Sequence, residues 1–531
     1  ESGFTPFYVY MFTVIAFLIL LIASLNYMNL STAAAFRRTR EIGTRKTLGA
    51  RKSSLIGQFL GEATLISIVS LLIAVAALQT ITPAINEYTG KALSLFNLPL
   101  SWLLAICATL IGSSLLASLY PAFIVAKVSP TEAIKKEIRL AKRNIPVRKI
   151  LVTAQFAVSI IMISSTLIIF RQLNFMRDKE LGIEVDNLVA IDINSGIQRN
   201  QFQSIKNEFL RLPEVQSVTV SSRVPGEWKR FPIASVNHTT STAKADMIYV
   251  GIDEDFLETF DIQLKEGRNF GLPGSADSAK VILTELAVEQ LGLENPIGQV
   301  ISIPSISIGG RVRPRNEPFE AEVIGVIENF YFESFRNEMR PLIFANYNNP
   351  IHGIDYYTLR ITTANWDQTL TNLKRINSQF DPENPVMYNF LDYKFNEFYK
   401  SDARRGQIFL AFSLVIILIA CLGLFALVSF SVENRKKEIG VRKILGASTE
   451  GIVGLLSKEF ISLVLVSFVI AIPFVIMTMQ NWLSEFAYHI DFGVGTFALS
   501  GFIAVLIAFA TISIRSIKAA NANPVESLRT E

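Results

Sequence analysis

Long apolar stretches without charged residues dominate the pattern of hydrophobic and polar positions in this chain. A helix needs about 20 apolar residues to cross roughly 30 Å of hydrocarbon, and a Lys or Arg at its centre costs about 2.5–3.5 kcal/mol. The pattern therefore predicts a membrane protein, an α-helical bundle of seven transmembrane helices. The stretches are Phe7–Phe36, Ala63–Asn86, Ala92–Ala126, Ile150–Phe170, Gly406–Val432, Phe460–Ser484 and Phe492–Ile514.

Basic residues gather in three of the loops between these stretches. The loops after the first, third and fifth stretches carry runs of Lys and Arg, whereas residues 485–491 include neither. Because cytoplasmic loops carry the excess of Lys and Arg, we expect the C-terminus inside, and residue 1 and the segment 171–406 outside. Every basic run adjoins a span, which favours contact with membrane lipid and not with nucleic acid.

The chain of 531 residues is 50% hydrophobic and only 18% charged, as the membrane class requires. Cys107 and Cys421 lie inside apolar stretches, so they cannot form a disulfide framework for the outside segment. The three histidines are far apart and have no ligand-type neighbours at metal-binding spacing, and we expect no metal site. No G-x-x-x-x-G-K-[ST] occurs, so energy for any work would come from a partner.

A ten-residue loop occurs twice. EIGTRKTLGA at 41–50 and EIGVRKILGA at 438–447 differ at two positions, and the same offset of 397 residues relates the spans before them. The chain is therefore a parallel duplication of a three-helix unit. Repeat logic also predicts that the natural protein begins about 230–250 residues earlier, with one more span and one more outside domain.

The third span of each copy is followed by a helix-start pattern. Ser129–Glu132 and Asn523–Glu526 both place a capping residue before Pro and a Glu at the third helical position. We expect a short cytoplasmic helix after each of these patterns.

The repeated loop itself has a helical pattern. A Glu and an Arg four residues apart can pair, and a Gly at the ninth position can end the helix. The apolar face is stronger in the second copy, where Val and Ile replace Thr44 and Thr47. Such a helix could lie on anionic lipid or dock in the groove of another protein, and the near-identity of the two copies favours docking.

The outside segment alternates strands with amphipathic helices, and two β-α-β units flank an insertion of about 130 residues. This order predicts a split α+β domain. Ser221, Ser222, Asp253, Glu254 and Asp255 are expected to be scattered surface or turn residues. No G-x-S-x-G and no histidine near a nucleophile occur, so we expect no catalytic residues.

Together these features resemble the FtsX/MacB family of ABC transporter permeases, in a long duplicated form that is N-terminally truncated here. Both loops look like its R-x-x-E-I-G-x-R-K-x-L-G-A signature. The segments 224–226 (VPG), 266–270 (EGRNF), 295–298 (NPIG) and 323–327 (VIGVI) are similar, in this order, to its extracytoplasmic core domain.

The resemblance implies a domain organisation. Residues 1–145 would be a first FtsX-like unit of three transmembrane helices, and 146–170 the leading transmembrane helix of the second half. Residues 171–406 would be a MacB-like core domain, and 407–531 the second FtsX-like unit. Coupling helices at 37–52 and 434–449 would dock on two copies of an ABC ATP-binding subunit. The residues implied are Glu41, Ile42, Gly43, Arg45, Lys46, Leu48, Gly49 and Ala50, and Glu438, Ile439, Gly440, Arg442, Lys443, Leu445, Gly446 and Ala447.

The resemblance also implies mechanotransmission in a bacterial inner membrane. ATP and Mg would bind the partner subunit, and this chain would bind no cofactor and no metal. Glu62 and Glu459, at the cytoplasmic starts of their spans, could relay the motion or simply pair with a nearby cation such as Lys458.

Three functions are open at this point. The expected function is export or extraction of peptides, lipoproteins, lipids or drugs, with a periplasmic adaptor or outer-membrane component as a further partner. The alternative is a non-transporting signal relay that activates an outside partner such as a cell-wall hydrolase. A membrane-anchored enzyme is the third, and it lacks a catalytic constellation.

Overall fold

The computed structural model describes residues 6–89, 92–127, 145–238, 244–272 and 276–521. The chain divides into two compact units. The first unit comprises Glu1–Arg171, Arg404–Asn481 and Asp491–Glu531, and the second comprises Gln172–Ala403 and Trp482–Ile490. The two patterns predicted to start short helices, at 129–132 and 523–526, lie outside the described residues.

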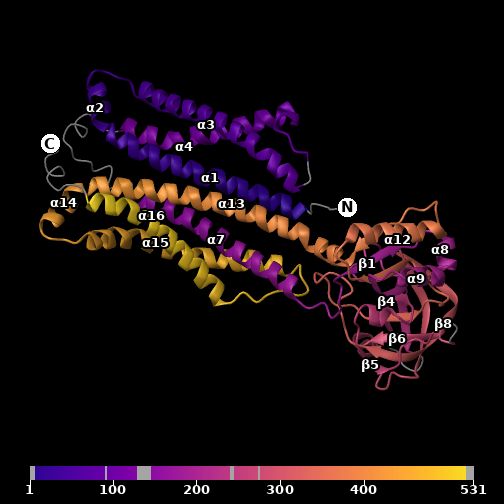
Figure 1. Cartoon of the computed structure of the whole chain (residues 1–531). Coiled ribbons are helices and arrows are strands. Elements are labelled where there is room, and N and C mark those ends of the chain that lie inside the picture. The colour runs from indigo at the N-terminus through magenta and orange to yellow at the C-terminus, as the bar shows by residue number, and fades with distance from the viewer. Residues whose placement is uncertain (1–5, 90–91, 128–144, 239–243, 273–275, 522–531) are drawn as a thin grey trace. The chain divides into compact units, whose positions relative to one another are not determined.

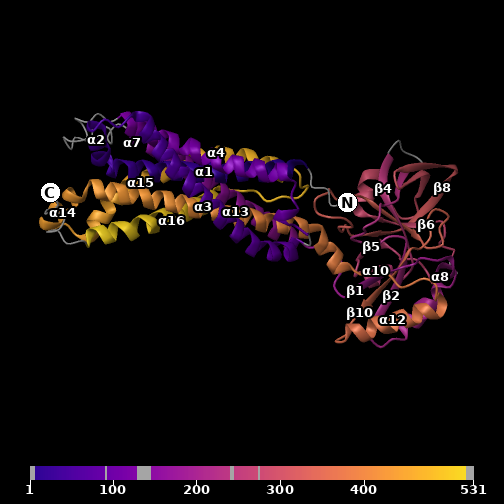
Figure 2. The ribbon, with the colours of Figure 1, turned by 90° about the horizontal axis from the view of Figure 1, so that it is seen from above.

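Seven helices in the described part of the chain are long and apolar enough to cross a membrane, which confirms the prediction of seven spans (Figures 1 and 2). Each has an apolar middle that agrees with the sequence pattern, and several extend beyond the predicted stretch into polar residues. The helices are α1 (Pro6–Arg37), α3 (Lys52–Thr89), α4 (Leu100–Lys127), α7 (Ile145–Asp178), α13 (Leu391–Asn434), α15 (Thr449–Leu483) and α16 (Val494–Ala520). A short 3₁₀ helix, η1 (Leu95–Asn97), precedes α4.

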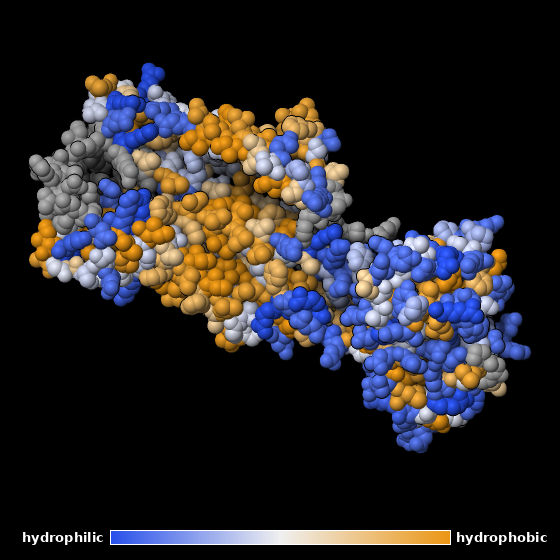
Figure 3. Space-filling model, in the orientation of Figure 1, coloured by the Kyte–Doolittle hydropathy of each residue, from blue (hydrophilic) through white to orange (hydrophobic). Residues whose placement is uncertain are grey.

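Apolar side chains cover the outside of these helices. Figure 3 shows hydrophobic residues gathered over the long helices and hydrophilic residues over the α+β unit. Phe17, Leu72, Val469 and Leu506 are among the large apolar side chains that the surface exposes. Exposed aliphatic and aromatic residues on charge-free helices fit a hydrocarbon environment, where all backbone polar groups must be paired within the helix.

The second half of the first unit packs around α7. In the apolar segment of α7, 72% of the residues are buried. Its Phe156 and Ile160 join a core with residues of α13, α15 and α16, among them Leu424, Val464 and Ala508. The helix predicted to lead the second half is thus a central element of that half.

Helices α1 and α13 lie side by side (Figure 1). The ring centroids of Phe12 and Phe412 are 5.9 Å apart. Further along, Asn26 Nδ2 donates to the carbonyl oxygen of Ile419 at 3.4 Å, and Gln155 Nε2 of α7 donates to the same oxygen at 3.1 Å.

This contact lies on the symmetry axis of the duplication. The offset of 397 residues pairs Asn26 with Gly423, and a Cβ atom on Gly423 would lie 3.1 Å from Asn26 Oδ1. Residues that meet their own counterparts mark the position of a twofold axis. The pseudo-twofold axis therefore passes between Asn26 and Gly423, where the two residues differ.

One part of the second unit is built on four neighbouring strands of an 11-stranded sheet, in the order β11-β1-β10-β2. Strand β10 lies between β1 and β2 and is antiparallel to both. This arrangement confirms the predicted split α+β domain. Its elements are β1 (Leu188–Asp192), α8 (Gly196–Asn200), α9 (Phe202–Leu210), β2 (Val215–Ser221), β10 (Tyr356–Ile361), α12 (Trp366–Phe380) and β11 (Tyr388–Phe390).

The insertion between β2 and β10 forms a closed circuit of strands. The order β4-β3-β7-β8-β6-β9 closes because β4 also pairs with β9. Gly309 and Gly310, with φ of 63° and 84°, make the tight turn between β7 and β8, since a two-residue hairpin of this kind needs positive φ. The elements are β3 (Ile233–His238), β4 (Lys244–Ile252), α10 (Phe256–Thr259), β5 (Leu264–Gly267), β6 (Lys280–Thr284), α11 (Glu285–Leu291), β7 (Val300–Ile308), β8 (Arg311–Ile327) and β9 (Leu342–Asn346).

The expectation of scattered surface residues at 221–222 and 253–255 is wrong in part. Ser221, Ser222 and Asp253 are buried at the junction of β2 and β4. Ser222 Oγ accepts the backbone N–H of Gly251 at 2.8 Å. These polar residues are internal because the ends of the two strands meet there, and the side chains of Ser222 and Asp253 each accept a backbone N–H.

Candidate functional site

The two copies of the repeated loop form two short helices. Helix α2 spans Thr39–Thr47 and α14 spans Lys436–Ile444. Each follows a long helix after a single non-helical residue, Arg38 with ψ of 8° or Arg435 with ψ of 14°. Figure 1 shows both short helices at the same end of the first unit.

Both helices end in the same hydrogen-bonded turn. In the first copy the N–H of Gly49 donates to Lys46 O at 3.1 Å, and that of Ala50 donates to Arg45 O at 3.0 Å. Gly446 and Ala447 repeat these bonds in the second copy at 3.1 and 3.0 Å. The glycines have φ of 94° and 90°, which a side chain would strain, so the predicted helix ends at glycine are confirmed. Folding alone therefore explains why both copies have glycine at this position.

One isoleucine anchors each short helix to its own bundle. Ile42 is buried against Leu55 and Phe59 of α3. Ile439 is buried against Ile452 and Leu456 of α15, near Ala520 of α16. Gly43 and Gly440 are buried beside them. These four residues of the expected docking set therefore hold the helices in place.

The opposite face of each helix is open. Leu48 is 87% exposed and Leu445 is 80% exposed, so neither packs in its own bundle. Val441 and Ile444 are exposed as well, whereas the hydroxyls of Thr44 and Thr47 donate to backbone carbonyls of their own helix at 2.8 and 2.7 Å. The exposed face is thus more apolar in the second copy, as predicted from the sequence.

Both expected intrahelical ion pairs form. Arg45 lies 2.7 Å from Glu41, and Arg442 lies 2.8 Å from Glu438. At these exposed positions each pair contributes only a few tenths of a kcal/mol. Burial, together with nearby Lys52, lowers the pKa of Lys46 on the same helix.

In the first copy a chain of polar contacts joins the short helix to α3. Arg45 Nη1 donates to Gln58 Oε1 at 2.9 Å, and Gln58 Nε2 donates to Glu62 Oε1 at 3.1 Å. Glu62 also accepts from Arg38, at the start of α2, at 3.1 Å. This series of polar contacts spans the break between α1 and α2.

The second copy makes the same Arg–Glu pair with a different neighbour. Arg435 lies 3.0 Å from Glu459, as the offset from Arg38 and Glu62 requires. Leu455 replaces Gln58, and the other contact of Glu459 is Lys149 of α7, at 2.9 Å. The expected pairing of each Glu with a nearby cation is thus present, although the cations beside Glu459 are Arg435 and Lys149 and not the exposed Lys458.

Sequence reasoning missed Gln58 and Lys149 as members of this site. The offset of 397 residues could have found the pairing of Arg38 with Glu62 and of Arg435 with Glu459, since all four match in both copies. Nothing in the sequence places Lys149 beside Glu459, because their contact depends on how α7 packs against α15.

Comparisons with known families cover most of the chain. Residues 13–130 and 410–524 match the family described as FtsX-like permease C-terminal. Residues 152–376 match the MacB-like periplasmic core domain. The two matched permease segments begin in α1 and α13 and include both short helices.

Curated relatives match over a shorter region. The chain is 33% identical over 124 residues to the macrolide export ATP-binding/permease protein MacB of Psychrobacter arcticus, covering 23% of this chain and 18% of that protein. It is 31% identical over 126 residues to MacB of Bordetella avium, covering 24% and 19%. The chain thus spans about a fifth of the length of these relatives.

Two solved structures resemble part of the chain. The periplasmic region of MacB from Actinobacillus actinomycetemcomitans is 18% identical, with a TM-score of 0.27, over 40% of this chain and 92% of that one. The extracellular domain of the ABC-type transporter YknZ from Gram-positive bacteria is 16% identical, with a TM-score of 0.26, over 38% and 100%.

Proposed function

The chain belongs to the FtsX/MacB-type ABC transporter permeases of the inner membrane, and from this premise we propose that it couples ATP hydrolysis by a separate ATP-binding subunit to work outside the membrane. In this proposal α2 and α14 are the coupling helices, and each docks on one of two ATP-binding subunits. ATP and Mg bind those subunits, because no phosphate-binding P-loop motif occurs within the 531 residues of this chain.

The observation that carries the proposal is the paired, exposed helix face. Leu48 and Leu445 are large, exposed apolar side chains that directly follow α2 and α14, and both helices lie at the same end of the first unit (Figure 1). The buried Ile42 and Ile439 fix the orientation of this face, so a partner would meet a preorganised surface. Exposed Glu and Arg residues beside each leucine supply polar contacts at the rim.

Mechanotransmission is the mechanism we propose for the coupling. Helix α7 ends at Asp178 shortly before β1, and α13 begins at Leu391 directly after β11. A displacement of these helices therefore passes along the chain into the α+β unit. The spans contain few ionisable residues, so a polar path for a substrate through the bilayer is not the favoured route.

Glu62 and Glu459 are the residues we assign to the transfer of motion from the coupling helices. Each joins the start of its short helix to the following span through an arginine. Glu459 also contacts Lys149 of α7, so a shift of α14 would act on the helix that leads to β1.

Export or extraction of peptides, lipoproteins, lipids or drugs at the outer face is the activity proposed. The names of the curated relatives include macrolide export. The cargo molecules proposed for this chain resemble macrolides in being amphiphilic. A periplasmic adaptor or outer-membrane component would complete the assembly. In this proposal the C-terminus and both coupling helices lie in the cytoplasm, and the excess of Lys and Arg in the loops on that side supports this orientation.

The docking test replaces Leu48 and Leu445 by Asp together, in the full chain co-expressed with its ATP-binding subunit. Losing both leucines from a contact that buries them should weaken association at least about a hundredfold, at about 1.5–3 kcal/mol each. Co-purification and ATPase activity measure the effect. Both side chains are exposed, so the fold should remain intact.

The reversal of Arg45 and Arg442 to Glu should have the same effect, whereas Arg45→Lys with Arg442→Lys keeps the charge and should retain the partner. Full association of the Leu48→Asp, Leu445→Asp chain would refute the coupling role of both helices.

A further inference from the structure

Three segments of the second unit meet at the loop 331–340, which lies between β8 and β9. They are residues 172–179 at the end of α7, residues 391–403 at the start of α13, and the turn 482–490 between α15 and α16. Each of the three contains one end of a candidate span. The loop is therefore a place where the continuations of several spans can act on the α+β unit.

The ammonium of Lys179 lies among aromatic rings from the loop, the turn and α7 itself. Its Nζ is 3.5 Å from the ring centroid of Tyr488 in the turn. The rings of Tyr331 and Phe335 in the loop lie 5.1 and 5.5 Å from the same atom, and that of Phe175 in α7 lies 5.6 Å away. A cation is attracted to the face of an aromatic ring. Lys179 thus connects α7 to the loop and to the turn at once.

Gln172 makes a second connection between α7 and the turn. Its side chain is fully buried. Its Nε2 donates to the carbonyl oxygen of Tyr488 at 2.9 Å, and its Oε1 accepts the N–H of Ile490 at 2.9 Å. Separating these groups would leave buried donors and acceptors without partners, which is costly. The turn is therefore held firmly to the end of α7.

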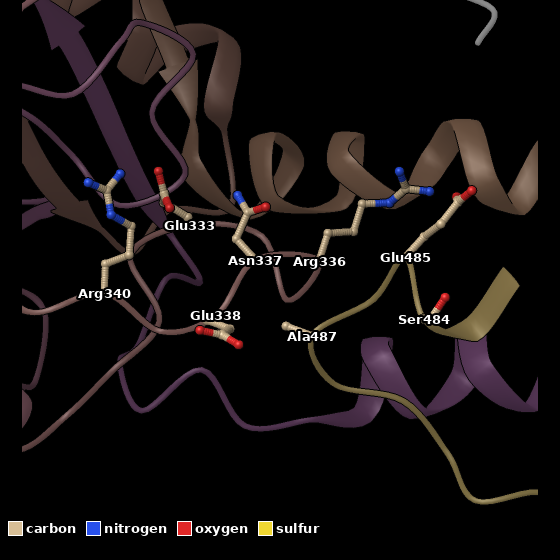
Figure 4. Close-up of a pocket in the computed structure, with 8 residues that line it drawn as sticks. All are labelled: Glu333, Arg336, Asn337, Glu338, Arg340, Ser484, Glu485 and Ala487. Carbon is tan, nitrogen blue, oxygen red and sulfur yellow. The ribbon is translucent and has the colours of Figure 1, made fainter. Parts of the chain in front are cut away.

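The turn and α13 also contact the loop directly. Figure 4 shows Arg336 beside Ala487, whose N–H donates to Arg336 O at 3.0 Å. The side chain of Arg336 extends toward α13, where its Nη2 donates to Asp402 Oδ1 at 2.8 Å. The N–H of Phe335 donates to Tyr399 Oη of α13 at 3.0 Å. All three segments thus contact the same loop.

The loop is in turn anchored in the core of the α+β unit. Phe332 is buried among the core residues, and its carbonyl oxygen accepts the N–H of Gly226 at 3.0 Å. The strands at the two ends of the loop, β8 and β9, both pair with β6 in the closed circuit. A displacement of the loop would therefore act on these strands, because a closely packed interior transmits strain.

We infer that the loop 331–340 is a joint through which displacement of the spans reaches the α+β unit, with Lys179 and Tyr488 as its positioning residues. The inference rests on the proposed coupling function and adds a non-covalent route to the chain connections of α7 and α13. Helix α15 carries Glu459 and ends directly before the turn, although no strand adjoins it in the chain. The joint gives its motion a route into the α+β unit.

The test uses the full chain with its ATP-binding subunit in lipid nanodiscs. It measures hydrogen exchange of the β8 and β9 amides with and without a non-hydrolysable ATP analogue. The analogue should change this exchange in the unmodified chain. Lys179→Met and, separately, Tyr488→Leu should abolish the change. Both should retain the ATP-binding subunit and its ATPase activity, because the coupling helices belong to the first unit.

Conservative variants separate the joint from a general effect on folding. Lys179→Arg keeps a cation over the rings and Tyr488→Phe keeps the ring, so both should retain the response. Lys400→Met is the matched control, because Lys400 Nζ lies 5.1 Å from the ring centroid of Tyr393 and both residues belong to α13. It should also retain the response. Without the analogue, exchange of the β1 and β10 amides should be the same in all chains.

The possible failures are distinguishable. A full response in both Lys179→Met and Tyr488→Leu would overturn the joint and leave the coupling function standing. A response that is lost in Lys400→Met as well would also overturn it, since that contact connects no separate segments. No response in the unmodified chain would overturn mechanotransmission, and the joint with it.

Discussion

Lys206 of α9 shows how much a single residue holds together in the second unit. Its ammonium is buried and lies between the carboxylates of Asp253 and Asp255. Asp253 also accepts the N–H of Val220 at 3.1 Å and the hydroxyl of Thr219. This cluster of Lys206 and its carboxylate partners thus joins α9, β2 and the end of β4. Nothing in the sequence pairs Lys206 with residues 47 and 49 positions away.

The pKa of Asp253 sets the pH dependence of this cluster. Burial raises the pKa to about 6, although Lys206 opposes the rise. Between about pH 4 and pH 6 the folded chain therefore keeps a proton that the unfolded chain has lost. The contribution of Asp253 to stability is full below this window and falls as the pH rises through it.

We expect Lys206→Met to destabilise the second unit by about 3 kcal/mol at pH 7, because it leaves a buried carboxylate without its cation. The loss should shrink at pH 5, where Asp253 without Lys206 takes up a proton more readily. Hydrogen exchange of the β2 and β4 amides, compared with the unmodified chain at each pH, measures both effects.

Lys265→Met is the control, because Lys265 makes an exposed pair with Glu285, and its loss should leave the exchange of these amides unchanged. An equal loss at pH 5 and pH 7 for Lys206→Met would contradict the assigned titration of Asp253.

At the scale of elements, the contact of α1 with α13 depends on a glycine. A Cβ atom on Gly423 would lie 2.9 Å from Gln155 Nε2 and 3.1 Å from Asn26 Oδ1. In a membrane, close approach of helices relies on small residues and interhelical hydrogen bonds, since no hydrophobic effect drives the association. At the pseudo-twofold axis, Gly423 allows the close approach and Asn26 supplies an interhelical hydrogen bond.

Gly423→Leu should therefore separate α1 from α13, at about 1–3 kcal/mol for overpacking. In a chain without Cys107 and Cys421, cross-linking of Phe12→Cys to Phe412→Cys by a short bifunctional maleimide reports the contact, and its yield should fall. Gly454→Leu is the control, because a Cβ atom there meets nothing within 4 Å. Equal yields in the two variants would show that the glycine does not set the distance between the helices.

At the scale of the whole molecule, the orientation that we propose puts the basic loops in the cytoplasm and the α+β unit outside. Leu48 directly follows α2 in one of these loops, and Asn316 lies on β8 in the α+β unit. In the cysteine-free chain, a membrane-impermeant maleimide added to intact cells with a permeable outer membrane should label Asn316→Cys. It should label Leu48→Cys only after the inner membrane is opened. Labelling of Leu48→Cys in intact cells would reverse the orientation.

The sequence predicted the elements of the fold well where their patterns are local. Charge-free stretches gave all seven long helices, and period-two alternation with an amphipathic helix gave β1, β2, β10, α9 and α12. The closed circuit β4-β3-β7-β8-β6-β9 was not predicted, because strand order depends on pairings between residues far apart in the chain.

For the candidate site, the amino-acid sequence by itself determined the two short helices, their glycine ends and their Glu–Arg pairs, since each rests on neighbours within one or two turns. Only the tertiary structure decided that Ile42 and Ile439 face inward while Leu48 and Leu445 face outward. It also decided that Glu459 meets Lys149, that Asn26 meets Gly423, and that residues 333–340 meet 484–487. These are contacts between distant segments, and packing of whole elements selects them, because no local pattern fixes which surfaces meet.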